Sequence, residues 1–552
     1  MIDAKYLGAV VMTAVGLLPL SAGAVPTMIR NVHGYSVGGE RLDRFDSMVF
    51  EDGRVLAVGP VSRLRSAYPT ARVIDGHGRT LLPGLIDAHG HVLALGLDMV
   101  RVQLGDTQSL AAAQQRISVY AKTHRQAHWL LGGGWNQATW KLGRFPTATD
   151  LDRVVSDRPV ALARIDGHAL WLNSAALREA SISKDTKDPV GGRIERATDG
   201  SPTGVLVDKA MALAERVVPV PTKDQQRIAL TAALAHLASV GLTGVGDAGA
   251  SAAQIGLYRS LADSRTLPIR IYAMIDGVGR DFEELSTTGP LIGYGNDHLT
   301  VRAIKLYADG ALGSRGAALL EPYADDPSQS GLLFESNAAM TQNIVKALAA
   351  GYQVNVHAIG DAANRQVLDA FEAAYRVGAG RDRRNRVEHA QIVSLTDIPR
   401  FKSLNLIASM QPTHATSDMN MAVDRLGKER LRGAYAWRTF LDQGTVIAAG
   451  SDFPVESDNP FFGLHAAVTR TDHSGQPAAG WYPEQALTRL EALRAFTLDA
   501  AYAQHQESSV GSLEPGKWAD FILVDRDFFN IAAAEIWRIH VEQTWVGGHR
   551  VY

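Results

Sequence analysis

The sequence of 552 residues contains no cysteine. This absence excludes a disulfide framework, a cysteine zinc cluster, iron–sulfur ligation and a thiol nucleophile. A chain of this length buries most of its apolar surface without cross-links, so a stable globular protein is still expected. Metal or proton chemistry must use other side chains, and the 17 histidines are the main supply.

The sequence also lacks an excess of either charge. Lysine and arginine number 55 against 58 acidic residues, which gives a formal net charge of −3, and no long basic run occurs. Because binding to phosphate backbones needs clustered Lys and Arg, nucleic acid is not an expected partner. A small-molecule ligand is more compatible with this composition, and the sequence leaves the formation of a homo-oligomer open.

Long hydrophobic runs are missing after the first two dozen residues, so no stable membrane insertion is expected once these are removed. At the N-terminus, Lys5 precedes an apolar run over residues 6–20 and small residues at 21–24. This pattern predicts a signal peptide over residues 1–24 with cleavage after Ala24, and hence a periplasmic or secreted protein. A membrane anchor or a buried first helix are the alternatives.

Several common catalytic motifs are incomplete or lack the structural context that they need. Residues 244–249 match G-x-G-x-x-G, but residues 230–240 before them have a helical pattern where a dinucleotide site needs a strand. Residues 511–517 resemble a phosphate-binding loop, yet Trp518 stands where a Mg²⁺-binding hydroxyl is required. The G-x-S-x-G pattern occurs once, at residues 34–38, ahead of the β-rich N-terminal segments and not between a strand and a helix, where a nucleophile elbow would lie. Nucleotide-dependent oxidoreduction and a nucleophile-elbow esterase are therefore poor alternatives.

Short β-rich segments separated by Gly, Asp and Pro occur at both ends of the chain. They occupy residues 47–50 and 54–58 near the N-terminus, and 520–525 and 544–551 near the C-terminus. A hairpin turn is expected at Gly547-Gly548. We expect the two ends to pair into one small sheet domain.

Between the ends, short apolar runs repeatedly end in polar residues and are followed by stretches rich in Ala and Leu. Eight such runs occur, which is the number that a (β/α)8 barrel needs. They cover residues 81–89, 242–247, 269–276, 301–306, 353–357, 386–389, 407–412 and 446–452. The gap of about 150 residues between the first two is too long for one crossover, so we expect an inserted subdomain or lid there.

Histidines and an aspartate stand where these predicted strands end. His89 and His91 are two residues apart, so on a strand both imidazoles project from the same face, and the intervening glycine leaves room for an ion. His357, His389 and Asp452 end three further strands. Because the strand ends of a barrel meet around one site, these residues predict a metal centre, whereas core packing explains them poorly.

Imidazole and carboxylate ligands suit Zn²⁺ best, with Fe²⁺, Mn²⁺ or Ni²⁺ as alternatives. Lys305 ends the fourth predicted strand, where a salt bridge is the simplest role. A lysine ammonium beside cations is strongly disfavoured. A functional Lys305 should therefore be neutral or converted into an anion.

Taken together, these motifs resemble the amidohydrolase superfamily, specifically its YtcJ-like branch, amidohydrolase family 3. The resemblance covers nearly the whole chain after residue 24 and is carried by residues 82–91, 304–310, 357–361, 387–389, 450–454 and 511–516. It implies an α/β fold, a distorted (β/α)8 barrel over residues 80–504 with an insert over residues 100–230. It also implies a small β-sandwich formed by residues 25–79 and 505–552.

The resemblance further implies one or two divalent metal ions and assigns their ligands. His89 and His91 would bind the more buried metal, Lys305 would be a carbamylated bridging ligand, His357 and His389 would bind the second metal, and Asp452 would be both ligand and proton shuttle. Asp452, Lys305 and His357 are the predicted catalytic residues. A metal-activated hydroxide would attack the substrate carbonyl, and Asp452 would return the proton to the leaving nitrogen.

The expected activity is hydrolysis of a linear amide C–N bond, with N-acyl or N-formyl amines favoured because family 3 resembles N-substituted formamide deformylases. Hydrolysis of a cyclic amide, carbamate or peptide in the same site is the enzymatic alternative. A non-catalytic periplasmic binding protein is a more distant one, because such proteins do not need converging histidines and an aspartate.

Four further residues are predicted to contact substrate, each with a structural alternative. His168 belongs to a stretch recurrent in the family's insert, and it could instead make a structural hydrogen bond. Trp135 is a candidate aromatic wall or a core residue, and Arg315 a candidate clamp for a carbonyl or carboxylate or a member of a surface ion pair. His414 follows the seventh strand in a similar position.

Two acidic residues are candidates for orienting the imidazole ligands. Glu388 adjoins His389, and Asp87 lies close to the H-x-H motif. Carboxylates commonly accept a hydrogen bond from a metal-binding imidazole. Surface or packing roles are the alternatives.

Overall fold

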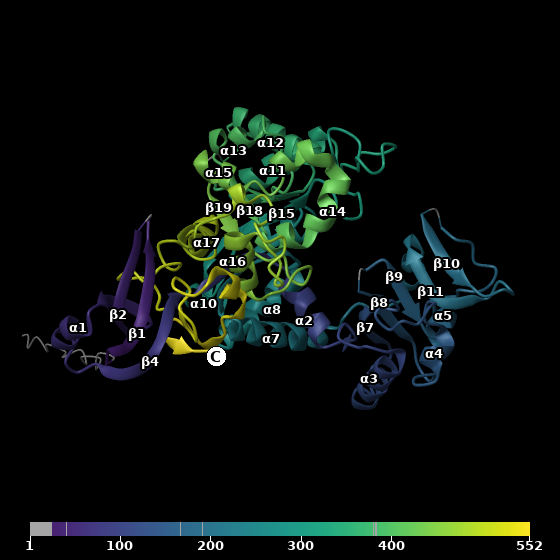
Figure 1. Cartoon of the computed structure of the whole chain (residues 1–552), viewed down its shortest axis with the longest axis horizontal. Helices are drawn as coiled ribbons and strands as arrows, with labels where there is room; N and C mark the ends of the chain where they lie inside the picture. Colours follow the sequence, from purple (N-terminus) through teal and green to yellow (C-terminus); the bar gives the residue numbers. More distant parts are fainter. Residues whose placement is uncertain (1–24, 40, 166, 190, 379, 381–382) are drawn as a thin grey trace, which may run out of the picture.

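The computed structural model describes residues 25–39, 41–165, 167–189, 191–378, 380 and 383–552, so the predicted signal peptide lies outside the described residues. Three sheets organise this part of the chain. Figure 1 shows a central barrel with one smaller sheet on either side of it. Among the described helices, none combines the length and the apolar character needed to cross a bilayer.

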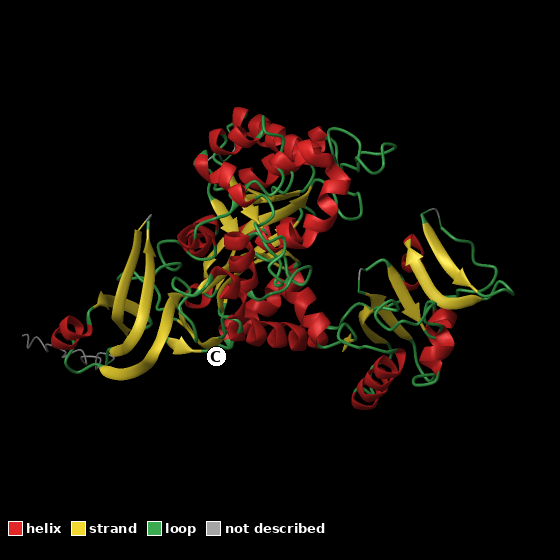
Figure 2. Cartoon of the chain, viewed as in Figure 1, coloured by secondary structure: helices red, strands yellow, loops and turns green. Residues whose placement is uncertain are grey.

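The central sheet contains eight parallel strands, one for each predicted β/α unit. In spatial order they are β5 (Leu85–Gly90), β12 (Leu242–Ala250), β13 (Arg270–Asp276), β15 (Leu299–Tyr307), β16 (Gln353–Ala358), β17 (Arg386–His389), β18 (Ile407–Met410) and β19 (Ile447–Ala449). A short strand, β14 (Leu291–Gly293), pairs antiparallel with β15. The strands are almost wholly buried because helices cover their outer faces (Figure 2).

Contacts between the segment after β19 and β5 nearly close the barrel. The Asp452 N–H donates to the His89 carbonyl at 2.8 Å, and the His91 N–H donates to the Phe453 carbonyl at 2.8 Å. The Ser451 hydroxyl donates to the Asp87 carboxylate at 2.7 Å. Asp87 also accepts from the His89 N–H at 3.0 Å, so this buried carboxylate joins the first and last strands.

Helices fill the connections between the strands. They are α2 (Val92–Met99), α7 (Lys223–Ser239), α8 (Ala252–Asp263), α9 (Arg280–Leu285), α10 (Tyr294–Asp297), α11 (Asn337–Ala349), α12 (Asp361–Arg376), α13 (Ile398–Ser403), α14 (Pro412–Arg430), α15 (Trp437–Asp442), α16 (Pro460–Thr469), α17 (Arg489–Ala495) and α18 (Leu498–Ala503). Local signals set several boundaries. Thr222, for example, forms a capping box with Gln225 at the start of α7.

Both chain ends contribute to a seven-stranded mixed sheet, as predicted. Its order is β22 (His549–Arg550), β21 (Val541–Val546), β20 (Phe521–Val524), β4 (Arg72–Pro83), β1 (Thr27–Gly38), β2 (Arg41–Glu51) and β3 (Arg54–Gly59), with α1 (Val61–Ala67) after β3. The β20 strand pairs antiparallel with β4, and β4 leads directly into β5. The expected hairpin turn at Gly547-Gly548 connects β21 and β22.

The insert between β5 and β12 forms its own six-stranded sheet. The order is β10 (Gly192–Arg196), β11 (Pro202–Asp208), β9 (Ala169–Leu172), β8 (Val160–Arg164), β7 (Leu130–Trp135) and β6 (Val102–Gln103). Helices α3 (Leu110–Thr123), α4 (Ala148–Asp152), α5 (Ser174–Glu179) and α6 (Ala212–Glu215) accompany it. The barrel, the insert and the sheet from both ends confirm the predicted fold class, while the exact domain limits stay predictions.

The G-x-G-x-x-G segment lies within β12, and α7 ends at Ser239, just before it. A side chain at Gly246 would clash with the neighbouring strand, because a Cβ there would lie 2.2 Å from the Ala88 carbonyl oxygen. These glycines thus belong to a barrel strand, as the sequence indicated, and they allow close packing between strands.

Candidate active site

The predicted metal ligands meet at the C-terminal ends of the barrel strands, where barrel enzymes place their active sites. His89 belongs to β5 and His91 follows it, Lys305 lies on β15, His357 lies on β16, His389 ends β17, and Asp452 follows β19. The side chains of His89, Lys305, His389 and Asp452 are all buried. Strands separated by hundreds of residues thus deliver these side chains to one place.

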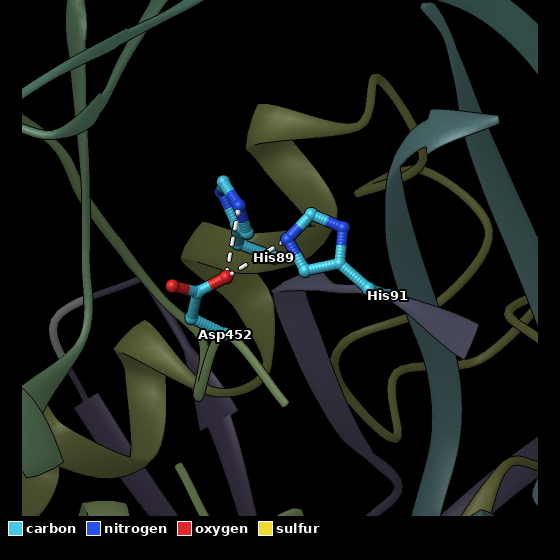
Figure 3. Close-up of side chains that lie close together, drawn as sticks. All are labelled: His89, His91 and Asp452. Atoms are coloured by element: carbon cyan, nitrogen blue, oxygen red, sulfur yellow. Dashed lines mark hydrogen bonds and ion pairs between the residues drawn. The ribbon is translucent and has the colours of Figure 1, made fainter. Parts of the chain in front are cut away.

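His89, His91 and Asp452 form the first group that could hold a metal ion. Figure 3 shows both imidazoles directed at the same carboxylate oxygen. The Asp452 Oδ1 atom lies 3.0 Å from His91 Nε2 and 3.5 Å from His89 Nε2. Two imidazole nitrogens and one carboxylate oxygen suit a Zn²⁺-type ion.

His389, His414 and Asp452 form a second such group, and all three side chains are buried. His414 Nε2 lies 3.7 Å from Asp452 Oδ2, and the rings of His389 and His414 stack with centroids 5.8 Å apart. The structure therefore places His414, a predicted substrate contact, among the potential ligands. Asp452 bridges both groups, which is the arrangement expected of a site for one or two ions.

Three of the imidazoles are oriented by a hydrogen bond at the nitrogen that faces away from the site. His89 Nδ1 lies 2.5 Å from a Glu388 oxygen, His91 Nδ1 2.8 Å from the Ala248 carbonyl, and His389 Nδ1 2.8 Å from the Gln411 side-chain oxygen. Such contacts fix the ring orientation and leave the other nitrogen available for a metal.

Glu388 is completely buried and held by two partners. One oxygen faces His89, and the other accepts from Arg386 Nε at 2.6 Å. Burial raises the pKa of this carboxyl, but the Arg386 guanidinium and His89 outweigh it and hold the pKa at about 2. Glu388 is therefore ionised, and it orients His89 rather than facing solvent.

His357 has a side-chain nitrogen that needs a partner. Its Nε2 atom is buried and makes no hydrogen bond to any described residue, and it lies 3.5 Å from Asp309 Oδ1. Burial and the nearby Lys305 lower the pKa of His357 to about 3, so the imidazole is neutral and can donate a lone pair. A neutral, buried and unpartnered imidazole nitrogen fits a metal ligand.

Lys305 is 1% exposed, and its Nζ lies 3.4 Å from His89 Nε2. Burial lowers the pKa of the Lys305 amine. Desolvation thus favours the neutral amine, in agreement with the expectation that Lys305 cannot be an ordinary ammonium beside a metal.

The Asp452 carboxylate is the charged partner of the histidines. Burial raises its pKa, but the hydrogen bond with His91 and the surrounding imidazoles hold the pKa well below its usual value. Asp452 and His389 also have left-handed backbone conformations, with φ of 63° and 72°. Such conformations cost non-glycine residues free energy and are found at sites where a side chain must be aimed.

A cavity of about 300 Å³ gives access to these residues, with His91, Lys305, His357, His389, His414 and Asp452 in its wall. This volume is in the range of small-molecule sites. A larger cavity of about 530 Å³ adjoins β19 elsewhere, but its charged side chains are engaged in the ion pairs Arg438–Glu491 and Arg494–Asp499. The side-chain chemistry therefore favours the smaller cavity as the candidate active site.

The other predicted substrate residues lie apart from this cavity. Trp135 is completely buried in the insert, where its Nε1 donates to the Leu162 carbonyl at 2.7 Å. His168 also lies in the insert, with Nδ1 2.9 Å from Asp208. Arg315 forms an ion pair with Asp325 at 2.9 Å. In this structure each makes the contact given as its structural alternative, and their substrate roles stay predictions.

Sequence reasoning missed several residues that support the site. Gln411 orients His389, Arg386 pairs with Glu388, and Asp309 accepts from the backbone N–H groups of Ile359 and Gly360 beside His357. Gln411 lies near the end of a predicted strand, which is the one signal that could have drawn attention to it, whereas Arg386 opens its strand.

Comparison with known proteins agrees with this geometry. The sequence profile of the amidohydrolase family matches residues 72–552. YtcJ of Bacillus subtilis (strain 168), a protein designated as an amidohydrolase, is 34% identical over 522 residues, covering 93% of this chain and 97% of that protein. The N-substituted formamide deformylase of Arthrobacter pascens is 29% identical over 515 residues, covering 91% and 94%.

A solved structure shows the same fold over nearly the full length. It is that of an uncharacterized metal-dependent hydrolase from Pyrococcus furiosus, with 28% identity and a TM-score of 0.76, covering 92% of this chain and 100% of that one. Since the family profile extends over most of the sequence and YtcJ matches almost end to end, the chain belongs to the amidohydrolase family, in the branch called family 3.

Proposed function

We propose that this hydrolase cleaves the C–N bond of a linear amide, of the N-acyl or N-formyl amine type. The observation that carries the proposal is the convergence of two His/Asp groups on Asp452 inside one cavity. The similarity to an N-substituted formamide deformylase supports the choice of a linear amide.

His89, His91, His357, His389, His414 and Asp452 are the residues that would hold one or two divalent ions, with zinc best suited to their donor atoms. When bound, such an ion lowers the pKa of water and polarises a carbonyl. Asp452, ionised and 3.0 Å from His91, is placed to accept a proton and return it to the leaving nitrogen. Glu388 and Gln411 hold the imidazoles in position.

Lys305 is proposed to become carbamylated. The neutral form of its buried amine, which desolvation favours, would add to CO2, forming an N–C bond and releasing one proton, and the product would be an anion beside the histidines. An anionic oxygen donor on Lys305 suits a cationic centre where an ammonium does not. Intact mass measured under native conditions should show the mass of one CO2, which Lys305→Met should abolish.

A substrate screen tests the function. We expect metal-loaded protein to release two products, an amine and an acid, from N-formyl or N-acyl amines, and elemental analysis to find a divalent metal. Ring opening of cyclic amides as a single product would favour the alternative of cyclic-amide hydrolysis. A metal-free protein that binds amides unchanged would contradict the proposal.

A further inference from the structure

One wall of the active-site cavity carries two carboxylates that the proposed mechanism does not use. Asp418 lies on α14, four residues after His414, and so on the same face of that helix. Glu456 lies in the loop between β19 and α16, four residues after Asp452. Both line the cavity. Asp418 therefore lies about one helical turn from His414, and Glu456 lies a short stretch of loop from Asp452.

The Asp418 carboxyl is held by hydrogen bonds to one of its two oxygens. Its Oδ2 atom accepts from the Tyr435 hydroxyl at 2.6 Å and from Gln391 Nε2 at 3.0 Å. Within the described part of the chain, Oδ1 accepts no hydrogen bond. Burial raises the pKa of the Asp418 carboxyl. A positively charged group bound in the cavity would stabilise the ionised form of this partly buried carboxyl.

Glu456 is tied to the same helix. Its Oε1 atom accepts from the Ser417 hydroxyl at 2.5 Å, and Ser417 directly precedes Asp418. The other oxygen of Glu456 has no hydrogen-bond partner among the described residues. The two side chains therefore present two free carboxylate oxygens at one side of the cavity.

Apart from Lys305 and the histidines of the candidate metal centre, no basic side chain described in the structure lines this cavity. Among the described residues that line the cavity there is no arginine, and Lys305 is the one lysine, buried beside His89. Ala311, Leu312 and Ile359 make the wall partly apolar. A neighbouring cavity of about 330 Å³ shares Lys305 and adds Asp276 and Glu335. Carboxylates lining such concave surfaces attract cations and repel anions.

A further observation points to a ligand-binding role for this part of the cavity. His414 Nε2 is buried, with the residue 9% exposed, and makes no hydrogen bond to a described residue although it lies 3.7 Å from Asp452. A buried imidazole nitrogen needs a partner, and the cavity is where a metal or substrate atom can provide it. Asp418 lies one helical turn beyond His414 on α14.

We propose that the substrate amide carries a positively charged nitrogen group, an ammonium, amidinium or guanidinium, bound by Asp418 and Glu456. This inference rests on the proposed amide hydrolysis and specifies its substrate class. A formyl group bears no substituent, so in N-formyl amines the cation belongs to the amine side of the amide. Substrates with a carboxylate on that side, such as N-acyl amino acids, are disfavoured because Asp418 and Glu456 would repel it and no arginine is among the described residues of the cavity wall.

Three matched compounds test the inference: N-formyl amines of equal chain length that end in an ammonium, a hydroxyl or a carboxylate. With metal-loaded protein, we expect kcat/KM for the ammonium compound to exceed that for the hydroxyl compound about tenfold or more, the effect of a charge-assisted hydrogen bond. The carboxylate compound should be the poorest. The preference should decrease as ionic strength rises.

The variants Glu456→Gln and Asp418→Asn should each reduce the ammonium-to-hydroxyl ratio severalfold while turnover of the hydroxyl compound persists, which shows that the protein is folded. Asp424→Asn, the same charge change at an exposed position of α14, should leave the ratio unchanged. A wild-type ratio near one that neither cavity variant alters would overturn the inference.

Calorimetric titration of the same compounds separates this inference from the proposed function. If none is hydrolysed but the ammonium compound alone binds, and Glu456→Gln weakens that binding, the amide-hydrolase proposal fails and the cation site stands. If all three are hydrolysed or bound equally, the cation site fails and amide hydrolysis can still stand.

Discussion

At the residue scale, the two ring nitrogens of each oriented imidazole have different roles. His89, His91 and His389 each direct one ring nitrogen at a carboxylate, a backbone carbonyl or an amide oxygen. The other nitrogen is thereby held at the centre before any ligand binds. Such positioning reduces the reorganisation that a bound ion or substrate would require.

Replacing Asp452 by Asn tests the proton-transfer role. The amide retains an oxygen that can face His91 but cannot accept a proton, so we expect kcat to fall about 100-fold to 10,000-fold while most of the metal stays bound. Metal content and turnover are measured on the same preparation. Turnover close to that of the wild type would remove Asp452 as the shuttle.

Glu388→Gln tests the orientation of His89. The change removes the charge that pairs with both His89 and Arg386 in a fully buried site. We expect metal affinity to fall about 10-fold to 100-fold, measured by competition with a chelator. Unchanged affinity would show that Glu388 serves only to neutralise Arg386.

At the scale of elements, helix α2 connects the metal site to the outer layer of the barrel. It starts directly after His91 and packs against α7. Gly96 permits this close approach, because a Cβ there would lie 2.1 Å from the Ala229 carbonyl oxygen. Any displacement of α2 would act on the backbone that carries His91.

Gly96→Ala is therefore expected to destabilise the protein by about 1–3 kcal/mol through overpacking, and to weaken metal binding. Gly256→Ala in α8 is the matched control, because a Cβ at Gly256 meets nothing within 4 Å. The control should be neutral or stabilising by about 0.5–1 kcal/mol. Chemical denaturation measures both, and equal effects of the two changes would refute the packing argument.

A pH-dependent contact joins α7 to the loop before α16. His236 Nε2 lies 2.6 Å from Asp458 Oδ2, and this pairing raises the pKa of His236 above its ordinary value of 6.5. Because the folded protein binds the proton more tightly, the contribution to stability is complete below pH 6.5 and is lost as the pH rises through the raised pKa.

His236→Gln should accordingly lower the unfolding midpoint in mildly acidic buffer and have a smaller effect at alkaline pH. Asp458→Asn should reproduce the same pH dependence, since it removes the other partner. Thermal unfolding at several pH values measures the difference from wild type. A difference that stays constant across pH would exclude His236 as its source.

At the scale of the whole molecule, a buried ion pair joins the barrel to the sheet formed by both ends. Arg270 at the start of β13 donates to Asp520, just before β20, through Nε at 2.6 Å and Nη2 at 2.9 Å. Asp520 also accepts from the Gly547 N–H at 2.7 Å. The side chains of Arg270 and Asp520 are 2% and 4% exposed.

Asp520→Asn should destabilise the protein by about 3–5 kcal/mol, because Arg270 is left as a buried charge without its counter-ion. Glu283→Gln, which breaks an exposed ion pair with Lys346, is the control and should leave the unfolding midpoint nearly unchanged. Denaturant unfolding compares the two. A small effect at Asp520 would mean that water reaches Arg270.

Much of the fold was predictable because it depends on local patterns. Eight apolar runs ending in polar residues correspond to the eight barrel strands. The short β-rich segments at both chain ends predicted the sheet in which the two ends pair. The candidate ligands His89, His91, His357, His389 and Asp452 could be named because each follows or ends such a run. Residues such as Asp418 and Glu456 could not, since they lie on a helix and a loop.

The sequence by itself determined the barrel, the family and the residue types of the metal centre, because hydrophobic period and motif spacing are properties of short segments. Only the tertiary structure decided that His414 lies among the candidate ligands, that Trp135 packs in the insert, and that Asp418 and Glu456 share a cavity wall. These outcomes depend on side-chain directions and on contacts between distant elements, which no local pattern encodes.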